Sequence, residues 1–478
     1  MNGRVKVSSS LGLSNSNGDL VAVQQGSSIR HRRHLILVVA FYCIFLLGVL
    51  ASLRLRPAND DYWIIAEAFS GIPSSLAFWW QSWSGFATTF SLNVLVVGLP
   101  GTHLPWALVS AVPFIFTSLT VGAVLLFLLG WTTSWFGWRS AFALAPVGAV
   151  LWWTFLWGAS LIGPTSPLVL GLTHWQNLNA AYVLPFSLLI AGYAWALVLG
   201  RPTRSWQRLM FVLILGLATG LAHLVISMSI LVTIGIVIAV RLSTRSRRGE
   251  WSITLPAVYA VLAILVGQFI ALAAPGSRVR RSAIAPEVPF SIEYAVSSTG
   301  QIIGQTVTDI STLVFAFGTV VTVGAAVLCA FVLKTRIALG STNRLRVLFH
   351  LGLLLSLTTA LVNNALELVV GFGYWHRSAL AVAVFFTAGL GGAYGGALLR
   401  SIGFLKSGKP LFLLGVVVVV LSLGSTAKLY ESALGRQSNW DVGPAPLSGA
   451  FDDINGPQPW ITRNWQVIAD SRDAPSRT

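Results

Sequence analysis

Acidic residues are scarce in this chain. Only 15 of its 478 residues are Asp or Glu, and charged residues of both signs make up 10% of the sequence. Hydrophobic residues account for 55% and the mean hydropathy is +0.75, whereas roughly 45–50% apolar residues are usual in soluble globular domains. This composition excludes a soluble globular protein. It predicts an all-α polytopic membrane protein, because a helix satisfies its own backbone hydrogen bonds in lipid.

Cysteine and several common functional motifs are also rare or missing. Both cysteines, Cys43 and Cys329, fall inside apolar runs, so neither a disulfide framework nor a metal-thiolate site is expected. The sequence has no Walker A motif, no dinucleotide-binding Gly-x-Gly-x-x-Gly and no His-Glu-x-x-His. We therefore expect no ATP-driven transport within this chain and no cofactor. No pattern indicates a divalent metal, although paired carboxylates leave room for one.

Basic residues are in excess, and their placement predicts an orientation. The formal net charge is +16, yet no basic block is interleaved with aromatic residues, so nucleic acid is not an expected partner. About 11 membrane spans are predicted near residues 35–53, 105–130, 140–162, 180–200, 207–222, 223–241, 251–273, 311–333, 347–369, 378–399 and 410–427. With the N-terminus inside and the C-terminus outside, 20 of the 31 lysines and arginines fall on the inner side, as the positive-inside rule requires. Arginine outnumbers lysine, which favours a GC-rich bacterial genome and hence the bacterial plasma (inner) membrane.

Three regions follow from this assignment. Residues 1–34 are rich in Ser, Gly and Asn and end in a basic cluster, which predicts a disordered cytoplasmic tail. Residues 35–427 form the transmembrane domain, with an outer loop at 54–104, and residues 428–478 form a short extracytoplasmic tail. Residues 86–102 are apolar, but counting them as a span would invert every later loop. We therefore expect an interfacial or re-entrant segment there.

The first candidate for function is the pair Asp60-Asp61, directly after the first span and followed by Tyr62 and Trp63. Adjacent carboxylates at a water–lipid boundary can take a proton from a hydroxyl, bind a metal, or hold a cationic or sugar substrate. The alternative is a hydrated helix end, which we would favour for a single Asp. A pair in so acid-poor a chain favours function.

Other polar groups are predicted on the same outer side. They are His174, Gln176 and Asn177 before the fourth span, Arg278, Arg280 and Arg281 after the seventh, and His376 and Arg377 between the ninth and tenth. Arginine donates paired hydrogen bonds to phosphate, so the cluster after the seventh span predicts phosphate binding, with lipid headgroups as the alternative ligand. Glu367 lies in an apolar run, where an ionisable group usually has a partner. Trp83 belongs to a tryptophan cluster that predicts an interface anchor or, alternatively, a sugar-stacking surface.

Short motifs in this chain resemble those of the GT-C superfamily of polytopic glycosyltransferases, and among them the bacterial O-antigen glucosyltransferase type. The matching pieces are Asn59-Asp60-Asp61-Tyr62-Trp63, Trp83-Ser84-Gly85, Ala274-Pro275-Gly276 followed by Arg278, and His376-Arg377-Ser378. They are spread over most of the membrane part. The chain departs from the larger members in lacking a large extracellular domain, and Gly85-Phe86 stands where related chains often have Gly-Arg.

The resemblance implies transfer of a sugar from a polyprenyl-phosphate donor to a glycan or glycolipid acceptor of the cell envelope, on the outer face. Asp60 would be the general base, and Asp61 would orient the acceptor or hold a metal. The expected donor-phosphate ligands are Arg278, Arg280, Arg281, His376 and Arg377, and the expected acceptor or sugar ligands are Trp83, His174, Gln176, Asn177 and Glu367. Two alternatives stay open. One is a flippase or transporter of lipid-linked saccharides, which the gathering of polar groups on one side disfavours; the other is an O-antigen ligase or polymerase.

Overall fold

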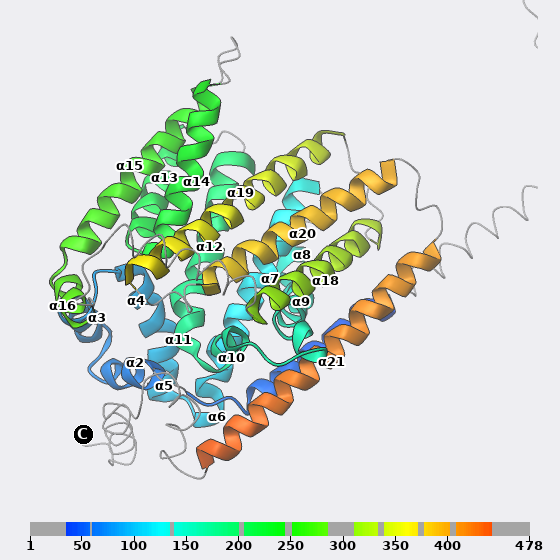
Figure 1. The fold of residues 1–478 in the computed structure, drawn as a ribbon, viewed down its shortest axis with the longest axis horizontal. Helices are drawn as coiled ribbons and strands as arrows, with labels where there is room; N and C mark the ends of the chain where they lie inside the picture. The colour runs from blue at the N-terminus through cyan, green and yellow to red at the C-terminus, as the bar shows by residue number, and fades with distance from the viewer. Residues whose placement is uncertain are drawn as a thin grey trace, which may run out of the picture.

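The computed structural model describes residues 35–57, 60–133, 138–199, 205–243, 251–284, 310–332, 339–370, 377–401 and 408–441. Within these ranges every regular element is a helix (Figure 1). Eight of the helices in these described ranges are long and apolar enough to cross a membrane. The chain is therefore an all-α, multi-pass membrane protein, as its composition predicts.

The eight candidate spans coincide with eight of the eleven predicted ones. They are Leu35–Ser52, Ala107–Gly130, Gln176–Val198, Leu224–Ser243, Leu255–Ala273, Asn343–Leu366, Arg377–Leu399 and Phe412–Gly435. The other three predicted spans correspond to the shorter apolar helices Ala145–Leu161, Trp206–Gly220 and Leu313–Val327. The break predicted near Gly220 and His223 is confirmed, because α13 ends at Gly220 and α14 begins at Leu224.

The bundle consists of helices that pack in pairs. From residue 106 onward its elements are α6 (Trp106–Val109), α7 (Ala111–Thr133), α8 (Trp138–Ala143), α9 (Ala145–Trp157), η2 (Gly158–Leu161), α10 (Pro167–His174), α11 (Gln176–Leu178), η3 (Asn179–Val183), α12 (Leu184–Tyr193), η4 (Ala194–Leu199), α13 (Ser205–Gly220), α14 (Leu224–Ser243), α15 (Trp251–Ala273), α16 (Pro275–Ile284), α18 (Ile310–Val332), α19 (Leu339–Val370), α20 (Arg377–Ser401) and α21 (Gly408–Asp441). Helix α7 runs along α9, α13 along α15, and α20 between α18 and α19.

Helix α9 forms the centre of the apolar core. All of its residues from Gly148 to Trp157 are buried, and Trp153 stacks on Phe114 from α7 and on Phe45 from the N-terminal helix. A Cβ atom at Gly48 would lie 2.0 Å from the Trp153 ring. Glycine at this position therefore lets the first span approach the core closely.

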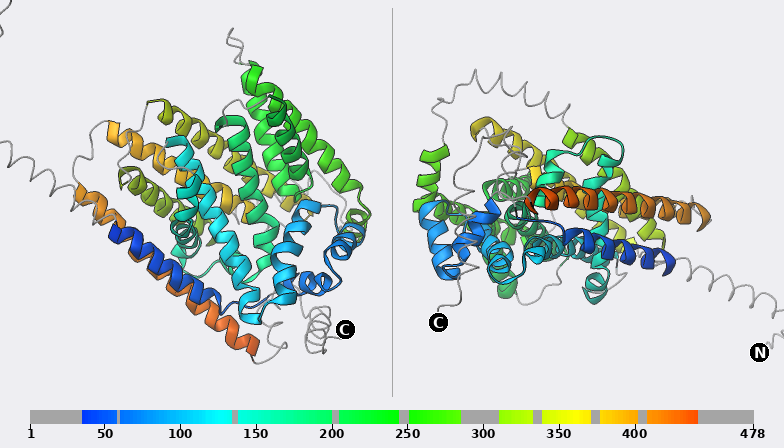
Figure 2. Two further views of the ribbon diagram at one scale, coloured as in Figure 1. Left: turned by 180° about the vertical axis from the view of Figure 1, so that it is seen from behind. Right: turned by 90° about the horizontal axis from the view of Figure 1, so that it is seen from below.

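The segment between the first two spans folds into a layer of short helices at one end of the bundle (Figures 1 and 2). Its elements are α2 (Asp60–Ala68), α3 (Ile72–Ser82), α4 (Ala87–Asn93), η1 (Val94–Gly98) and α5 (Leu99–His103). The layer has an apolar core of its own, which includes Ile64, Ile65, Trp79 and Phe90. Of residues 86–102, expected to be interfacial or re-entrant, 87–102 are helical; η1 and α5 lie against α2, and the segment is not among the eight candidate spans.

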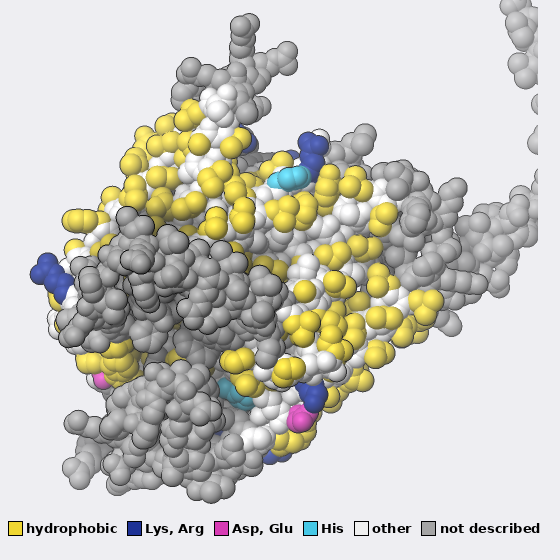
Figure 3. Space-filling view, viewed as in Figure 1, with side chains coloured by type: hydrophobic (Ala, Val, Ile, Leu, Met, Phe, Trp, Pro, Cys, Tyr) yellow, Lys and Arg dark blue, Asp and Glu magenta, His cyan; other side chains and the backbone are white. Residues whose placement is uncertain are grey.

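The last helix is longer than the predicted span. Helix α21 has 34 residues, which is about 51 Å at 1.5 Å per residue, so it continues well past the predicted end at residue 427. The expected N-terminal tail, residues 1–34, lies outside the described residues; of the expected C-terminal tail, residues 428–478, the part 428–441 belongs to α21 and the rest lies outside the described residues. Figure 3 shows hydrophobic side chains over the middle of one face and Lys and Arg near its margins, as expected for a surface that meets lipid.

Candidate functional site

Asp61 is buried and caps a helix that begins more than a hundred residues later. Its side chain is 1% exposed. Its Oδ1 atom accepts a hydrogen bond from the backbone N–H of Asn177 at 2.7 Å, and Oδ2 accepts one from Gln176 at 3.1 Å. The first N–H groups of a helix have no partner within it and carry partial positive charge. Asp61 therefore supplies acceptors and a compensating charge at the start of the span Gln176–Val198.

The neighbours of this helix start form a buried polar network. Gln176 donates from Nε2 to the carbonyl of Thr173 at 2.7 Å, and its Oε1 accepts from Asn179 Nδ2 at 3.1 Å. Nε2 of His174 lies 2.8 Å from Oγ of Ser432 in α21. Two groups expected at the outer side, around residues 61 and 174–177, are therefore in direct contact. The extension of α21 past the predicted span also reaches this site.

A second contact, called here the α3–α16 joint, connects Gly85 after α3 with Ser277 in α16, 192 residues apart along the chain. The backbone N–H of Gly85 donates to Oγ of Ser277 at 2.9 Å, and that hydroxyl donates to the carbonyl of Ala271 at 2.7 Å. A Cβ atom at Gly85 would lie 2.0 Å from the same Ala271 oxygen. The close approach of the two backbones explains why glycine occupies position 85.

Gly276 in α16 also packs closely against the backbone at the end of α3. A Cβ atom there would lie 2.6 Å from the backbone nitrogens of Trp83 and Ser84, and 2.7 Å from the carbonyl oxygen of Trp80. The beginning of α16 therefore rests directly on the end of α3. Arg278 follows within one turn of α16, and its side chain is exposed.

The remaining predicted phosphate and acceptor ligands are described in part. Arg280, Arg281 and Glu367 belong to α16 and α19, but their side chains lie outside the described part of the structure, as does His376. Arg377 is the first residue of α20 and is 6% exposed. Helix α20 packs against α10 and η3, the elements that carry His174 and Asn179.

Glu67 is a carboxylate that the sequence analysis missed. Its side chain hydrogen-bonds Trp63, which lies 4.7 Å from Trp79, 4.9 Å from Trp83 and 6.1 Å from Phe78 between ring centroids. Burial raises the pKa of the Glu67 carboxyl above its ordinary value, and the Trp63 hydrogen bond opposes this shift. The sequence did offer a signal for this contact, because an acid four residues after a tryptophan lies on the same side of a helix.

Helix register separates the two members of the acidic pair. Asp61, Ile64, Ile65 and Ala68 form the buried side of α2. Position 60 is seven residues, or about two turns, before Glu67, so these two positions lie on one side of the helix. That side differs from the buried side that carries Asp61. The side chain of Asp60 itself is outside the described part of the structure.

Phe86 is a buried aromatic residue at this end of the bundle, directly after Gly85. Its ring lies 5.1 Å from that of His223, and Nε2 of His223 lies 3.0 Å from the Tyr182 hydroxyl. Both Phe86 and His223 are buried. This pair, also missed by the sequence analysis, holds the segment between the first two spans against the turn between α13 and α14.

The described acidic side chains gather at one end of the bundle, whereas basic side chains occur at both ends. Asp61, Glu67 and Glu431 lie at the end just described, together with Arg278, Arg377 and Lys428, and Arg208 and Arg241 lie at the far ends of α13 and α14. Among the described residues, no three His, Cys, Asp or Glu side chains are grouped so as to hold a metal ion. Comparison with protein families, curated proteins and solved structures finds no match to this chain.

Proposed function

We propose that this protein is a membrane glycosyltransferase that moves a sugar from a polyprenyl-phosphate donor to a glycan or lipid acceptor. The observation that carries the proposal is the meeting, at one end of the bundle, of motifs far apart in sequence. Helix α2 with the acidic pair contacts the helix start at Gln176, and Trp83-Ser84-Gly85 contacts the beginning of α16, next to Arg278. In the proposed orientation this end faces the outside of a bacterial plasma membrane.

Asp60 is the proposed general base. Both carboxylate oxygens of its neighbour Asp61 already accept backbone hydrogen bonds, which suits a structural role. Asp60 would accept the proton of the acceptor hydroxyl while that oxygen attacks the anomeric carbon of the sugar. The bond between the anomeric carbon and the phosphate oxygen then breaks, and the electron pair leaves with the lipid phosphate.

Arginine side chains are the proposed partners of that phosphate. Arg278 stands exposed beside the joint between α3 and α16, and Arg377 begins a helix that packs on the His174 segment. Positive groups that are held in place before the reaction stabilise the negative charge that grows on the leaving group. Low water content at a membrane interface strengthens this effect.

The test is sugar transfer by the purified protein from a polyprenyl-phosphate-linked sugar. Asp60→Asn keeps the shape of the side chain but cannot take a proton, so turnover should fall by about 10²–10⁴ while donor binding persists. Neutralising Arg278 and Arg280 should weaken donor binding by roughly ten- to a hundredfold, the loss of a charged paired contact. If Asp60→Asn and Asp61→Asn both keep near-normal turnover, the carboxylates are structural and the proposal fails.

A second experiment separates transfer from the alternatives. Mass spectrometry of cell-envelope glycans, with and without the gene, should show the loss of a sugar residue. Loss of whole oligosaccharide blocks would instead indicate a ligase or polymerase. If membranes from cells without the gene still transfer the sugar once they are opened, but accumulate the donor on their inner side while sealed, the protein is a flippase.

A further inference from the structure

A half-buried carboxylate lies beside aromatic rings in the layer formed by α2 and α3. The two helices are joined by a turn at residues 69–71, in which Gly71 has a φ of 88°, a left-handed conformation that favours glycine. This turn folds α3 back against α2. Glu67 stands in the last turn of α2 and hydrogen-bonds the side chain of Trp63, one helical turn earlier. The carboxylate is therefore held beside the tryptophan that packs against α3.

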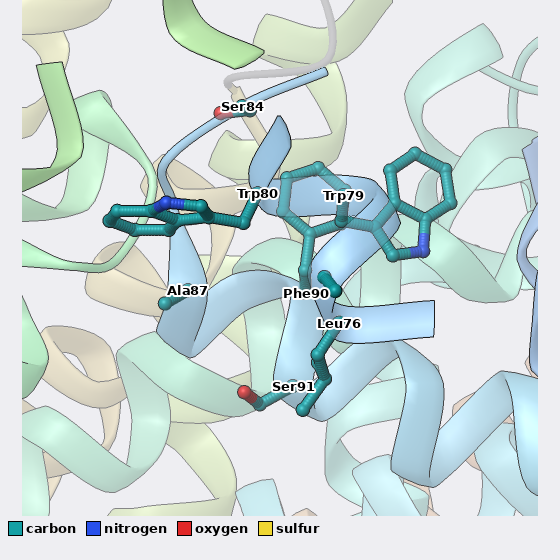
Figure 4. Close-up of a pocket in the computed structure, with 8 residues that line it drawn as sticks. Leu76, Trp79, Trp80, Ser84, Ala87, Phe90 and Ser91 are labelled. Carbon is teal, nitrogen blue, oxygen red and sulfur yellow. The ribbon is translucent and has the colours of Figure 1, made fainter. Parts of the chain in front are cut away.

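Trp63 is the centre of an aromatic cluster. Its ring centroid is 4.9 Å from that of Trp83 and 6.1 Å from that of Phe78, and both rings stand at 75° to it. Trp79, at 4.7 Å, is buried and stacks on Phe90 of α4, beside the apolar pocket between α3 and α4 that Figure 4 shows. Trp63, Phe78 and Trp83 are half-buried. The cluster thus has a fixed inner wall and an accessible side.

The Glu67 carboxylate has room for a further partner. An ionised carboxylate accepts hydrogen bonds at about four positions, and the indole N–H of Trp63 occupies one of them. Among the described residues Lys428 pairs with Glu431, whereas no Lys or Arg pairs with Glu67. An ionised carboxylate that is partly removed from water is costly unless a cation or hydrogen-bond donors compensate for the lost water. The site therefore favours a cationic ligand.

The surroundings of this carboxylate favour an organic cation over a metal ion. A calcium ion takes about 6–8 oxygen ligands, and within the described part of the chain no three His, Cys, Asp or Glu side chains are grouped to hold a metal. Aromatic faces within about 6 Å attract an ammonium group. A primary ammonium carries three N–H donors, which match the acceptor positions left on Glu67, whereas a quaternary ammonium carries none.

We propose that Glu67, together with the rings of Trp63 and Trp83, binds the primary ammonium group of an organic ligand. The carboxylate accepts hydrogen bonds from the ammonium, and the rings pack against the carbon atoms next to it. The layer of α2 and α3 lies at one end of the bundle (Figure 1) and outside the eight candidate spans, where lipid headgroups meet water. An ethanolamine headgroup, a free amine and an amino sugar share this chemistry. The inference does not depend on sugar transfer.

The experiment measures the melting temperature of the full-length protein in detergent at neutral pH. The added ligands are ethanolamine, glucosamine and short-chain phosphatidylethanolamine, and at least one of them should raise the melting temperature as its concentration increases, because it binds the folded state. Choline and short-chain phosphatidylcholine are the matched ligands, in which methyl groups replace the N–H donors. They should bind roughly tenfold more weakly, since hydrogen bonds to a charged group are lost.

Variants test whether the ammonium is bound at Glu67. Glu67→Gln keeps the length of the side chain and removes its charge, so binding should weaken by roughly ten- to a hundredfold. Glu67→Asp, which withdraws the charge by one methylene group, serves if Glu67→Gln does not fold. Trp83→Leu removes one aromatic face and should weaken binding by about two- to fivefold. Glu431→Gln is the matched control, because it removes an exposed carboxylate elsewhere and should bind as the unaltered protein does.

Each shift is measured against the same variant without ligand. A shift with phosphatidylethanolamine alone assigns the site to a lipid headgroup, and a shift with ethanolamine or glucosamine assigns it to a soluble amine. No shift with any of the three, equal shifts by an amine and its choline counterpart, or an undiminished shift in Glu67→Gln would each overturn the proposal. None of these results bears on sugar transfer, so the site and the proposed activity stand or fall separately.

Discussion

The carboxylate of Asp61 accepts a hydrogen bond from the backbone N–H of Asn177 at 2.7 Å, although the two residues are 116 positions apart. This contact ties α2 to the start of the span Gln176–Val198. It also divides the acidic pair, because consecutive residues of a helix point about 100° apart at 3.6 residues per turn. One carboxylate of the pair thus has a structural partner, and we assign the chemistry to the other.

Replacing Asp61 should destabilise the protein. Asp61→Ala leaves two N–H groups of a buried helix start without their acceptor, and an unsatisfied buried donor costs about 1–3 kcal/mol. Asp61→Asn keeps one oxygen near its place and should lose less. The measurement is the apparent melting temperature in detergent. A melting temperature for Asp61→Ala equal to that of the unaltered protein would contradict the capping role.

Replacing Gly276 should separate α16 from α3. Gly276→Ala places a methyl group within 2.7 Å of three backbone atoms, and overpacking of this kind costs about 1–3 kcal/mol. Gly235→Ala in α14 is the matched control, because a Cβ atom there meets nothing within 4 Å. That change should raise stability by about 0.5–1 kcal/mol, the ordinary difference between Ala and Gly in a helix. Equal melting temperatures for the two variants would show that α16 and α3 move apart without loss of stability, which would contradict the prediction.

Glu67 should make stability depend on pH. Burial raises the pKa of Glu67 in the folded protein above its ordinary value of 4.5, so the unfolded chain loses this proton first as pH rises. The folded state therefore loses stability between 4.5 and the raised pKa, and the loss is constant above it. Glu67→Gln cannot ionise, so its melting temperature relative to the unaltered protein should rise across that interval and then level off.

Trp63→Phe provides the control for this pH effect. It removes the hydrogen bond that lowers the pKa of Glu67, so the interval of pH-dependent loss should extend to higher pH. Melting temperatures measured from below pH 4.5 to neutrality check both variants. A difference between Glu67→Gln and the unaltered protein that does not change with pH would contradict the burial of the carboxyl.

The proposed orientation can be tested by cysteine labelling. In a background where Cys43 and Cys329 are replaced by Ser, single cysteines are placed at Ser70 and at Ser243, which are both exposed at opposite ends of the bundle. A membrane-impermeant thiol reagent should label Ser70→Cys in intact cells. It should label Ser243→Cys after the membrane has been opened and not before. The reverse pattern would place the candidate site on the inner side.

The helical membrane fold could be predicted from sequence because hydropathy along a helix is a local property. A run of apolar residues long enough to cross lipid is recognisable without knowing its neighbours. The break between α13 and α14 could also be predicted, since basic clusters flank both ends of the segment and one helix would place them on opposite sides. Asp61, Trp83 and Gly276 stood out for a similar reason, as unusual residues at the ends of apolar runs.

The partners of these residues were decided by the tertiary structure alone. That Asp61 caps the helix at Gln176, that His174 contacts Ser432, and that Glu67 is half-buried beside Trp63 depend on which helix faces come together. The close contact of α16 with the end of α3 likewise depends on Gly276, where a Cβ atom would lie 2.6 Å from two backbone nitrogens. Composition and periodicity describe each helix separately, whereas these contacts arise from packing between segments that lie up to 258 residues apart.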